Sequence, residues 1–122
     1  MDQEILNSYS RINHLNVSRE TFLDFENYIS MILEKNKKIN IISQNTASKK
    51  AIIDRHIIDS AQIIDFVDLN SNTTIDMGSG GGFPGIIVAI ILISLFLSCI
   101  IEIRLSSSLQ VSRETFKLEI FE

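Results

Sequence analysis

Residues 74–85 read Thr-Ile-Asp-Met-Gly-Ser-Gly-Gly-Gly-Phe-Pro-Gly, and this stretch decides the fold. It starts as a short strand, Thr74–Met77, and runs directly into a loop that holds all five glycines and the single proline of the 122-residue chain. Glycine is required where the backbone turns sharply or approaches a ligand without a Cβ in the way. Pro84 suits the first turn of a helix, where its missing N–H has no partner to lose. The stretch therefore predicts a strand, a ligand-binding glycine loop and a helix.

The residues after this loop continue the alternation of helix and strand. Residues 86–92 form the predicted helix, and the β-branched run at 96–103 predicts a second buried strand that ends near Glu102. A second helix at 106–116 and the start of a third strand at 117–121 follow. This order is typical of an α/β fold with a parallel sheet.

The first 72 residues read as helical instead. Ser18 can cap a helix that runs to about Asn36 with one apolar face, and residues 2–13 predict a shorter helix before it. Residues 37–45 are extended or irregular. We place the boundary in the polar break near residue 72, which gives a helical region at 1–72 and an α/β domain at 73–122.

A second long helix is expected before that break. Thr46 or Ser48 can cap it, and a broad apolar stripe continues to Val67. Within it, His56 is expected to be a packed, hydrogen-bonded side chain rather than a catalytic one, and Asp59 one turn on can orient it.

Composition narrows the class of protein. With 45% hydrophobic and 21% charged residues the chain is globular, and the single cysteine excludes an internal disulfide framework and fits a reducing compartment. Cys99 lies in an apolar stretch, where an inert buried thiol is expected. Residues 1–11 contain no signal-peptide pattern, so we expect a cytoplasmic protein.

The apolar run after the glycine loop allows a membrane interpretation. Residues 77–101 carry no charge, but the glycines and Pro84 leave only Ile86–Ile101 as an uninterrupted apolar segment. That is shorter than the roughly 20 residues that span a bilayer. A buried helix followed by a buried parallel strand gives the same pattern, and we favour it over a membrane segment.

The glycine spacing indicates the kind of ligand. An acid precedes alternate glycines in the order Asp76, Gly78, Gly80 and Gly82, and Glu102 would end the second strand, where an acid binds ribose hydroxyls. The stretch also fits the dinucleotide pattern Gly-x-Gly-x-x-Gly. The acid-first order favours S-adenosylmethionine, which has no pyrophosphate to bind.

Three segments resemble one family. Asp76–Ile86, with its Gly-Phe-Pro-Gly ending, resembles the signature of the bacterial ribosomal RNA small subunit methyltransferase G family, also called glucose-inhibited division protein B. Lys37–Ser43 resembles that family's Asn-Lys-x-Ile-Asn-Leu segment, and Arg55–Ser60 resembles its Arg-His-x-x-Asp-Ser motif. The likeness covers roughly Thr21–Leu92.

The resemblance implies a Rossmann-like methyltransferase that uses S-adenosylmethionine to methylate N7 of a guanosine in 16S ribosomal RNA. It implies that Gly78 and Phe83 contact the cofactor and that Glu102 holds its ribose. As an alternative to plain packing, it also implies a role for His56 in shaping the cofactor or RNA pocket, though not as a base. Guanine N7 carries no proton, so the transfer needs no general base, and we expect no catalytic side chain and no metal.

Positive charge is concentrated in one segment of an otherwise acidic chain. The chain has a formal charge of −4, which argues against general nucleic-acid binding. Residues 35–55 nevertheless carry a net charge of +5 and can neutralise RNA phosphates. The basic residues among them are Lys35, Lys37, Lys38, Lys49, Lys50 and Arg55. The alternative is a solvated lysine-rich connection.

The chain is shorter than the family it resembles, which keeps three functions open. The first is the ribosomal RNA methyltransferase. The second is a truncated, non-catalytic homologue that binds the cofactor weakly or not at all. The third is a small membrane-attached protein that uses Ile86–Ile101.

Overall fold

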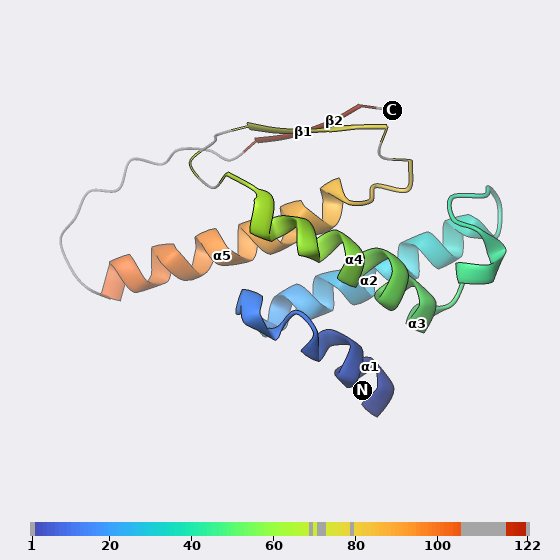
Figure 1. Ribbon diagram of the computed structural model, residues 1–122, viewed down its shortest axis with the longest axis horizontal. Helices are drawn as coiled ribbons and strands as arrows, with labels where there is room; N and C mark the ends of the chain where they lie inside the picture. The colour runs from blue at the N-terminus through green and yellow to red at the C-terminus, as the bar shows by residue number, and fades with distance from the viewer. Residues whose placement is uncertain (1, 69, 71–72, 79, 106–116, 122) are drawn as a thin grey trace.

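The computed structural model describes residues 2–68, 70, 73–78, 80–105 and 117–121, and the side chains at 2–68, 70, 75–78 and 80–95. Helical segments make up its N-terminal part, followed by a strand, a long helix and a second strand (Figure 1). The two strands lie together on one side of the molecule, with α5 and the other helices beneath them. The predicted helix at 106–116 lies outside the described residues.

The first two helices begin at capping side chains. Helix α1, Gln3–Ser10, starts after Asp2, whose carboxylate accepts a hydrogen bond from the Glu4 N–H. A 3-10 turn, η1 (Asn13–Leu15), follows. Helix α2, Arg19–Asn36, starts after Ser18, whose hydroxyl accepts from the Thr21 N–H. The predicted cap and extent of α2 are confirmed.

The second long helix is also confirmed, although its backbone is irregular. After the 3-10 turn η2 (Gln44–Thr46), Ser48 caps the segment by accepting from the Ala51 N–H. The segment then passes through four helical pieces of three types. These are α3 (Lys49–Ile52), the π-helical η3 (Ile53–Ile57), α4 (Ile58–Ala61) and the 3-10 helix η4 (Gln62–Phe66). No pattern in the sequence predicts the π turn.

The core forms where these helices meet. Side chains from α1, α2 and the 49–66 segment pack around fully buried isoleucines and one phenylalanine, which also contact the first half of α5. The largest fully buried members are Ile12, Phe25, Ile29, Ile52, Ile53, Ile57, Ile58, Ile87, Ile91 and Leu92. Burial of this apolar surface is the main force that holds the helices together.

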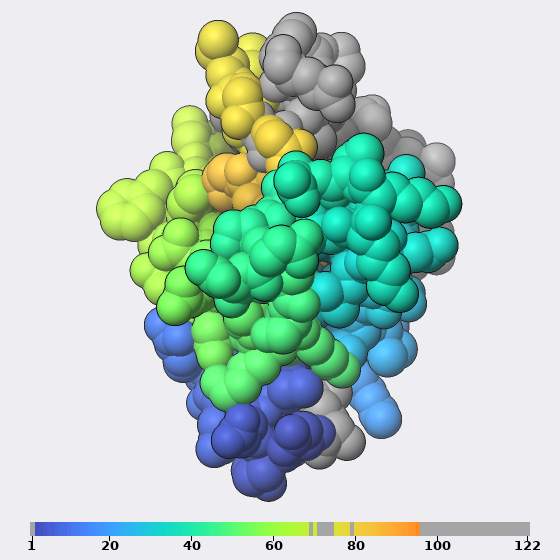
Figure 2. Space-filling model, turned by 90° about the vertical axis from the view of Figure 1, so that its right-hand side faces the viewer, coloured from blue at the N-terminus to red at the C-terminus, as the bar shows by residue number. Residues whose placement is uncertain are grey.

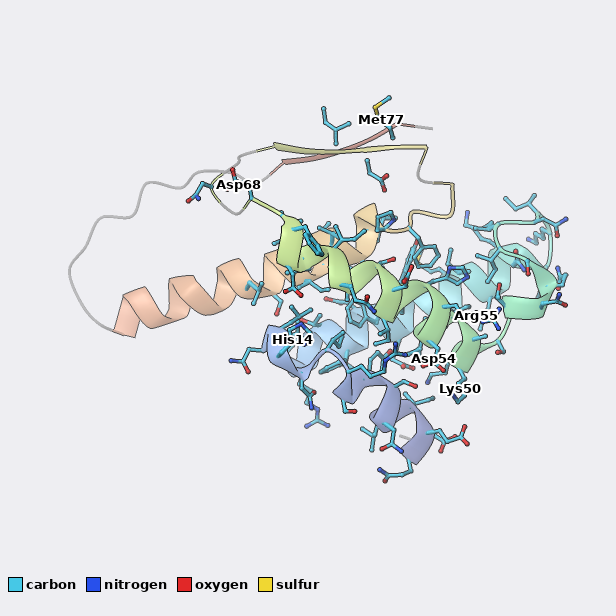
Figure 3. All side chains as sticks on the ribbon, in the orientation of Figure 1. His14, Lys50, Asp54, Arg55, Asp68 and Met77 are labelled. Atoms are coloured by element: carbon cyan, nitrogen blue, oxygen red, sulfur yellow. The ribbon has the colours of Figure 1, made fainter. Side chains whose placement is uncertain are left out.

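The two strands pair in parallel. Strand β1, Thr73–Met77, pairs with β2, Lys117–Phe121, so that Thr73 lies opposite Lys117 and Met77 opposite Phe121. Met77 is 82% exposed and points away from the helices (Figure 3). The strand expected at 117–121 is confirmed. The Rossmann-like half sheet of three strands is not seen in the described residues.

The strand predicted at 96–103 is wrong. Residues 85–105 form one helix, α5 (Gly85–Leu105), and Glu102 lies within it. No glycine, proline, asparagine or aspartate follows Gly85 in this run, so no residue interrupts the helix. A run that is apolar on every face shows no period, and β-branched content therefore misled the prediction.

Packing against the helical core fixes the first half of α5. Ile87, Val88, Ile91 and Leu92 share one buried face. At the next turn, the Ser94 hydroxyl lies 3.2 Å from the Ser18 hydroxyl. Tertiary contacts of this kind override the weak helix propensity of isoleucine and valine. The expected division at residue 72 stays a prediction.

In the part of the chain whose side chains are described, no helix is long and apolar enough to cross a membrane.

Candidate functional site

The predicted glycine loop connects β1 to α5. Gly78, Gly80 and Gly82 have φ angles of +72°, +54° and +84°, a region that residues with a Cβ rarely adopt. Glycine adopts these angles without strain, and asparagine is the residue with a side chain that tolerates them best, so the backbone path favours glycine at these three positions. The alternating spacing of the motif reflects this path.

Two of these glycines face open space. Gly78 and Gly80 are exposed, and a Cβ added at either would meet no described atom within 4 Å. A ligand can therefore approach their backbone closely. We call Gly78 and Gly80 the open half of the loop.

The remaining glycines allow the loop to pack. A Cβ on Gly82 would lie 2.5 Å from the Tyr28 hydroxyl oxygen, and one on Gly85 would lie 2.9 Å from the Asp76 Cβ. Both glycines are buried. Residues 81–85 thus form a packed half, in which glycine serves close approach within the protein.

Asp76 connects the strand to the helix. Its Oδ2 accepts a 2.8 Å hydrogen bond from the Gly85 backbone N–H, at the first residue of α5. A carboxylate at a helix N-terminus is stabilised by the unpaired N–H groups and the helix dipole. Sequence reasoning assigned this acid to the ligand, and the structure places one of its oxygens on the helix.

Phe83 lies between two rings from the helical region. Tyr28 of α2 meets it edge-on, with ring centroids 5.6 Å apart. His56 of η3 stacks on it at 4.8 Å and 26°. The Tyr28 hydroxyl also donates to the Gly81 carbonyl. Two segments far from the loop in sequence therefore hold its packed half.

Sequence reasoning missed Tyr28. The residue sits on the mostly apolar face of α2, one turn after Phe25, and a tyrosine in such a place needs a partner for its hydroxyl. That requirement was the available signal. Burial raises the pKa of Tyr28 to about 12, so the hydroxyl keeps its proton and remains a donor at neutral pH.

His56 is a packed side chain. Burial lowers its pKa below the ordinary value, a shift that the Asp59 carboxylate opposes and the Arg55 guanidinium reinforces. Its Nε2 is buried and has no hydrogen-bond partner among the described residues. The expected packing is therefore confirmed, and the expected bond to Asp59 is not seen at Nε2.

The lysine-rich turn after α2 abuts the loop. Buried Asn36 accepts hydrogen bonds on its side-chain oxygen from the backbone N–H groups of Ile41 (2.8 Å) and Ile42 (3.0 Å). A Cβ on Gly81 would lie 2.9 Å from the Ile41 Cγ2. Figure 2 shows this face, with the teal turn beside the yellow-to-orange residues of the loop and the start of α5.

The six basic residues differ in their partners. Lys49 pairs with Glu26, and Lys50 pairs with Asp54 at 2.7 Å. The other four are exposed and make no ion pair with a described residue; they are Lys35, Lys37, Lys38 and Arg55. Figure 3 shows Lys50, Asp54 and Arg55 on the same helical segment. Two of the six predicted RNA contacts are thus already neutralised.

Glu102 is far from the loop. Seventeen residues of α5 separate it from Gly85, or about 25 Å at the usual helical rise. The strand end on which its predicted role depended does not exist here, so we leave it out of the site. No cluster of potential metal ligands occurs among the described residues.

A strand, a glycine loop with an open half and a helix form the local arrangement of proteins that bind nucleotide-like cofactors. The family model for rRNA small subunit methyltransferase G matches residues 21–105, and the chain belongs to this family.

Curated relatives agree with the family assignment. The chain is 56% identical over 90 residues to a ribosomal RNA small subunit methyltransferase G from Pelagibacter ubique, covering 74% of this chain and 42% of the relative. Proteins of the same name from Allorhizobium ampelinum and Orientia tsutsugamushi are 42% and 39% identical over 69% and 67% of this chain, and over 38% and 40% of their own lengths. The chain thus spans about 40% of the length of these relatives. No solved structure matches it.

Proposed function

We propose that the protein binds S-adenosylmethionine at the open half of the glycine loop and methylates N7 of a guanosine in 16S ribosomal RNA. The observation that carries the proposal is the open backbone at Gly78 and Gly80, directly after β1. A Cβ at either glycine would fill the space that a ligand needs. The names of the relatives support the class of reaction and its substrate.

The start of α5 favours this cofactor over a dinucleotide. Dinucleotides place a pyrophosphate on the N–H groups at the start of the helix after the glycine loop. Here the Asp76 carboxylate accepts a hydrogen bond from the Gly85 N–H and puts a negative charge at the start of α5. A second anion there would be repelled, whereas a cationic sulfonium would be attracted.

The chain's own residues contribute positioning. S-Adenosylmethionine, when bound, supplies an electrophilic methyl group that the lone pair of guanine N7 can accept with no proton to remove. Gly78 and Gly80 would hold it close to the backbone, and Phe83 keeps the rest of the loop in place. Catalysis by alignment of this kind requires no acid or base.

RNA would reach the site along the lysine turn. Lys37 and Lys38 are exposed in the turn that touches Gly81 through Ile41. Phosphate contacts from such residues position RNA without reading its sequence. We propose Lys35, Lys37, Lys38 and Arg55 as the RNA-binding set and a cytoplasmic location for the protein.

The second candidate is a truncated homologue without transferase activity. The observation that favours it is that the chain spans about 40% of the relatives' length. The rest of each relative's length is not matched by this chain.

Methyl transfer to small-subunit RNA separates the candidates. Purified protein is incubated with labelled S-adenosylmethionine and 16S RNA, naked or in assembling subunits, and the nucleosides are then analysed. We expect N7-methylguanosine with the wild type and much less of it with Gly80→Asn at a limiting concentration of S-adenosylmethionine. Label on any other atom would overturn the N7 assignment. No label from a chain that binds the cofactor would favour the non-catalytic homologue.

A further inference from the structure

We infer that Tyr28 is a positioning residue for the cofactor loop. Its hydroxyl holds the backbone between the open and packed halves in the conformation that leaves Gly78 and Gly80 accessible. The ligand in this inference rests on the proposed function, whereas the tyrosine contact itself does not.

The hydrogen bond from Tyr28 is made to the part of the loop where three glycines follow one another. The carbonyl that accepts it belongs to Gly81, one residue after Gly80 of the open half. Gly80, Gly81 and Gly82 are consecutive, and glycine has the largest backbone freedom to lose on ordering. A single donor that fixes this peptide therefore restricts a run of three glycines.

Two further contacts make the placement specific. The Tyr28 ring packs edge-on against Phe83, which His56 contacts with its own ring. A Cβ on Gly82 would meet the same hydroxyl. Tyr28 thus touches or closely approaches three successive loop residues from a helix that begins more than fifty residues earlier in the chain.

Pre-organisation links this contact to affinity. A loop that is ordered before the ligand arrives loses less conformational freedom on binding, so the ligand binds more tightly. Removing the hydroxyl alone leaves the ring packing in place. We expect Tyr28→Phe to weaken binding by about 3- to 10-fold, the range for loss of one hydrogen bond.

The chain contains a matched control in its other tyrosine. Tyr9 is buried, whereas Tyr28 is half-buried, and like Tyr28 it uses its hydroxyl as a donor, to the Glu26 carboxylate at 3.3 Å. It lies in the helical core against Phe22 and Phe25. Tyr9→Phe therefore removes the same group from a place that does not touch the loop.

The test compares the wild type, Tyr28→Phe and Tyr9→Phe in three measurements. Calorimetric titration gives the affinity for S-adenosylmethionine, and thermal unfolding gives stability. Amide hydrogen exchange of the ligand-free proteins, followed by mass spectrometry, gives the protection of a peptide spanning residues 80–85. We expect weaker binding and faster exchange in that peptide for Tyr28→Phe only, with similar melting temperatures for the two variants.

Each outcome decides the inference. Wild-type affinity and wild-type loop exchange in Tyr28→Phe would overturn it, and so would a lower melting temperature as the only change. If the wild type does not bind S-adenosylmethionine, the proposed function fails. Loop exchange then decides the positioning role alone, since faster exchange in Tyr28→Phe than in Tyr9→Phe supports it and equal exchange overturns it.

Discussion

The carboxylate of Asp76, on β1, accepts a 2.8 Å hydrogen bond from the backbone N–H of Gly85, the first residue of α5. This bond closes the glycine loop by joining its two ends. It also leaves the start of α5 negatively charged. The acid that precedes the glycines therefore shapes the loop, and under the proposed function its charge would disfavour a pyrophosphate at this point.

Removing this carboxylate should destabilise the fold. Loss of an N-terminal helix cap costs about 1–2 kcal/mol, so we expect that reduction in the free energy of unfolding for Asp76→Ala. Asp76→Asn should cost less, because its amide oxygen still accepts. Urea unfolding measures both, with exposed Asp24→Ala as a control that should change little. Equal stability of Asp76→Ala and the wild type would show that the bond is dispensable.

The two halves of the loop should respond differently to substitution. Gly82→Ala brings a Cβ against the Tyr28 hydroxyl at a positive φ, and strain with overpacking should cost about 2–4 kcal/mol. Gly78→Asn should cost under about 1 kcal/mol, since asparagine tolerates positive φ and the space is open. The free energies of unfolding of both variants test this. Similar losses in the two variants would contradict the division.

Asn36 should be required for the lysine turn. Asn36→Ala leaves the N–H groups of Ile41 and Ile42 without their acceptor, which should cost about 1–3 kcal/mol. Asn40→Ala is the matched control, because Asn40 is exposed and makes only a long 3.5 Å contact with Gln44. Chemical unfolding compares the two variants. An Asn36→Ala protein as stable as Asn40→Ala would show that the turn folds without these two hydrogen bonds.

Acid should weaken the packing around Phe83. Burial holds the His56 pKa below 6.5 in the folded protein, so on acidification the unfolded chain takes up the proton first. Neutral His56 therefore contributes fully to the free energy of unfolding above about pH 6.5, and this contribution is lost as the pH falls below that value. The free energy of unfolding, determined at several pH values between about 7.5 and 5.5, measures this loss.

Substituting each histidine in turn shows which of them causes the loss of stability in acid. His56→Phe keeps a ring against Phe83 and should remove the pH-dependent part. The chain's other histidine, His14, is exposed and lies 3.7 Å from Asp65, so His14→Gln should keep it. If His56→Phe loses as much stability on acidification as the wild type, other titrating groups cause the effect.

Much of the helical region could be predicted because its signals are local. Ser18 and Ser48 each lie where a hydroxyl caps the helix that follows, and α2 shows a clear apolar face. The glycine loop was equally visible, since left-handed backbone at Gly78, Gly80 and Gly82 strongly favours that residue type.

The remaining features depend on tertiary contacts that no local pattern encodes. The run after Gly85 is apolar on all sides, so helix and strand could not be told apart, and Glu102 was misplaced with it. The role of Tyr28 depends on a partner in the loop more than fifty residues away. The pairing of Lys49 with Glu26 likewise appears only in three dimensions, whereas Lys50 and Asp54 are four residues apart on one helical segment, a spacing that the sequence itself shows.

The unpaired lysines should contribute more to RNA binding than the paired ones. Lys37→Ala/Lys38→Ala should lower the slope of log affinity against log salt by about 1.4–1.8, which corresponds to two phosphate contacts. Lys49→Ala/Lys50→Ala should change it less, because those side chains pair with Glu26 and Asp54. Fluorescence anisotropy with a labelled 16S fragment measures the slopes. Equal slopes for the two double variants would contradict the proposed RNA-binding set.

The proposed function requires that the open half of the loop binds S-adenosylmethionine. Calorimetric titration of the wild type and Gly80→Asn tests this, because asparagine tolerates the backbone but fills the open space. We expect saturable binding to the wild type, at least about tenfold weaker binding to a Gly80→Asn protein of unchanged melting temperature, and no change with Asn16→Gly, a positive-φ position outside the loop. Equal affinity for the wild type and Gly80→Asn, or no binding to a folded wild type, would contradict it.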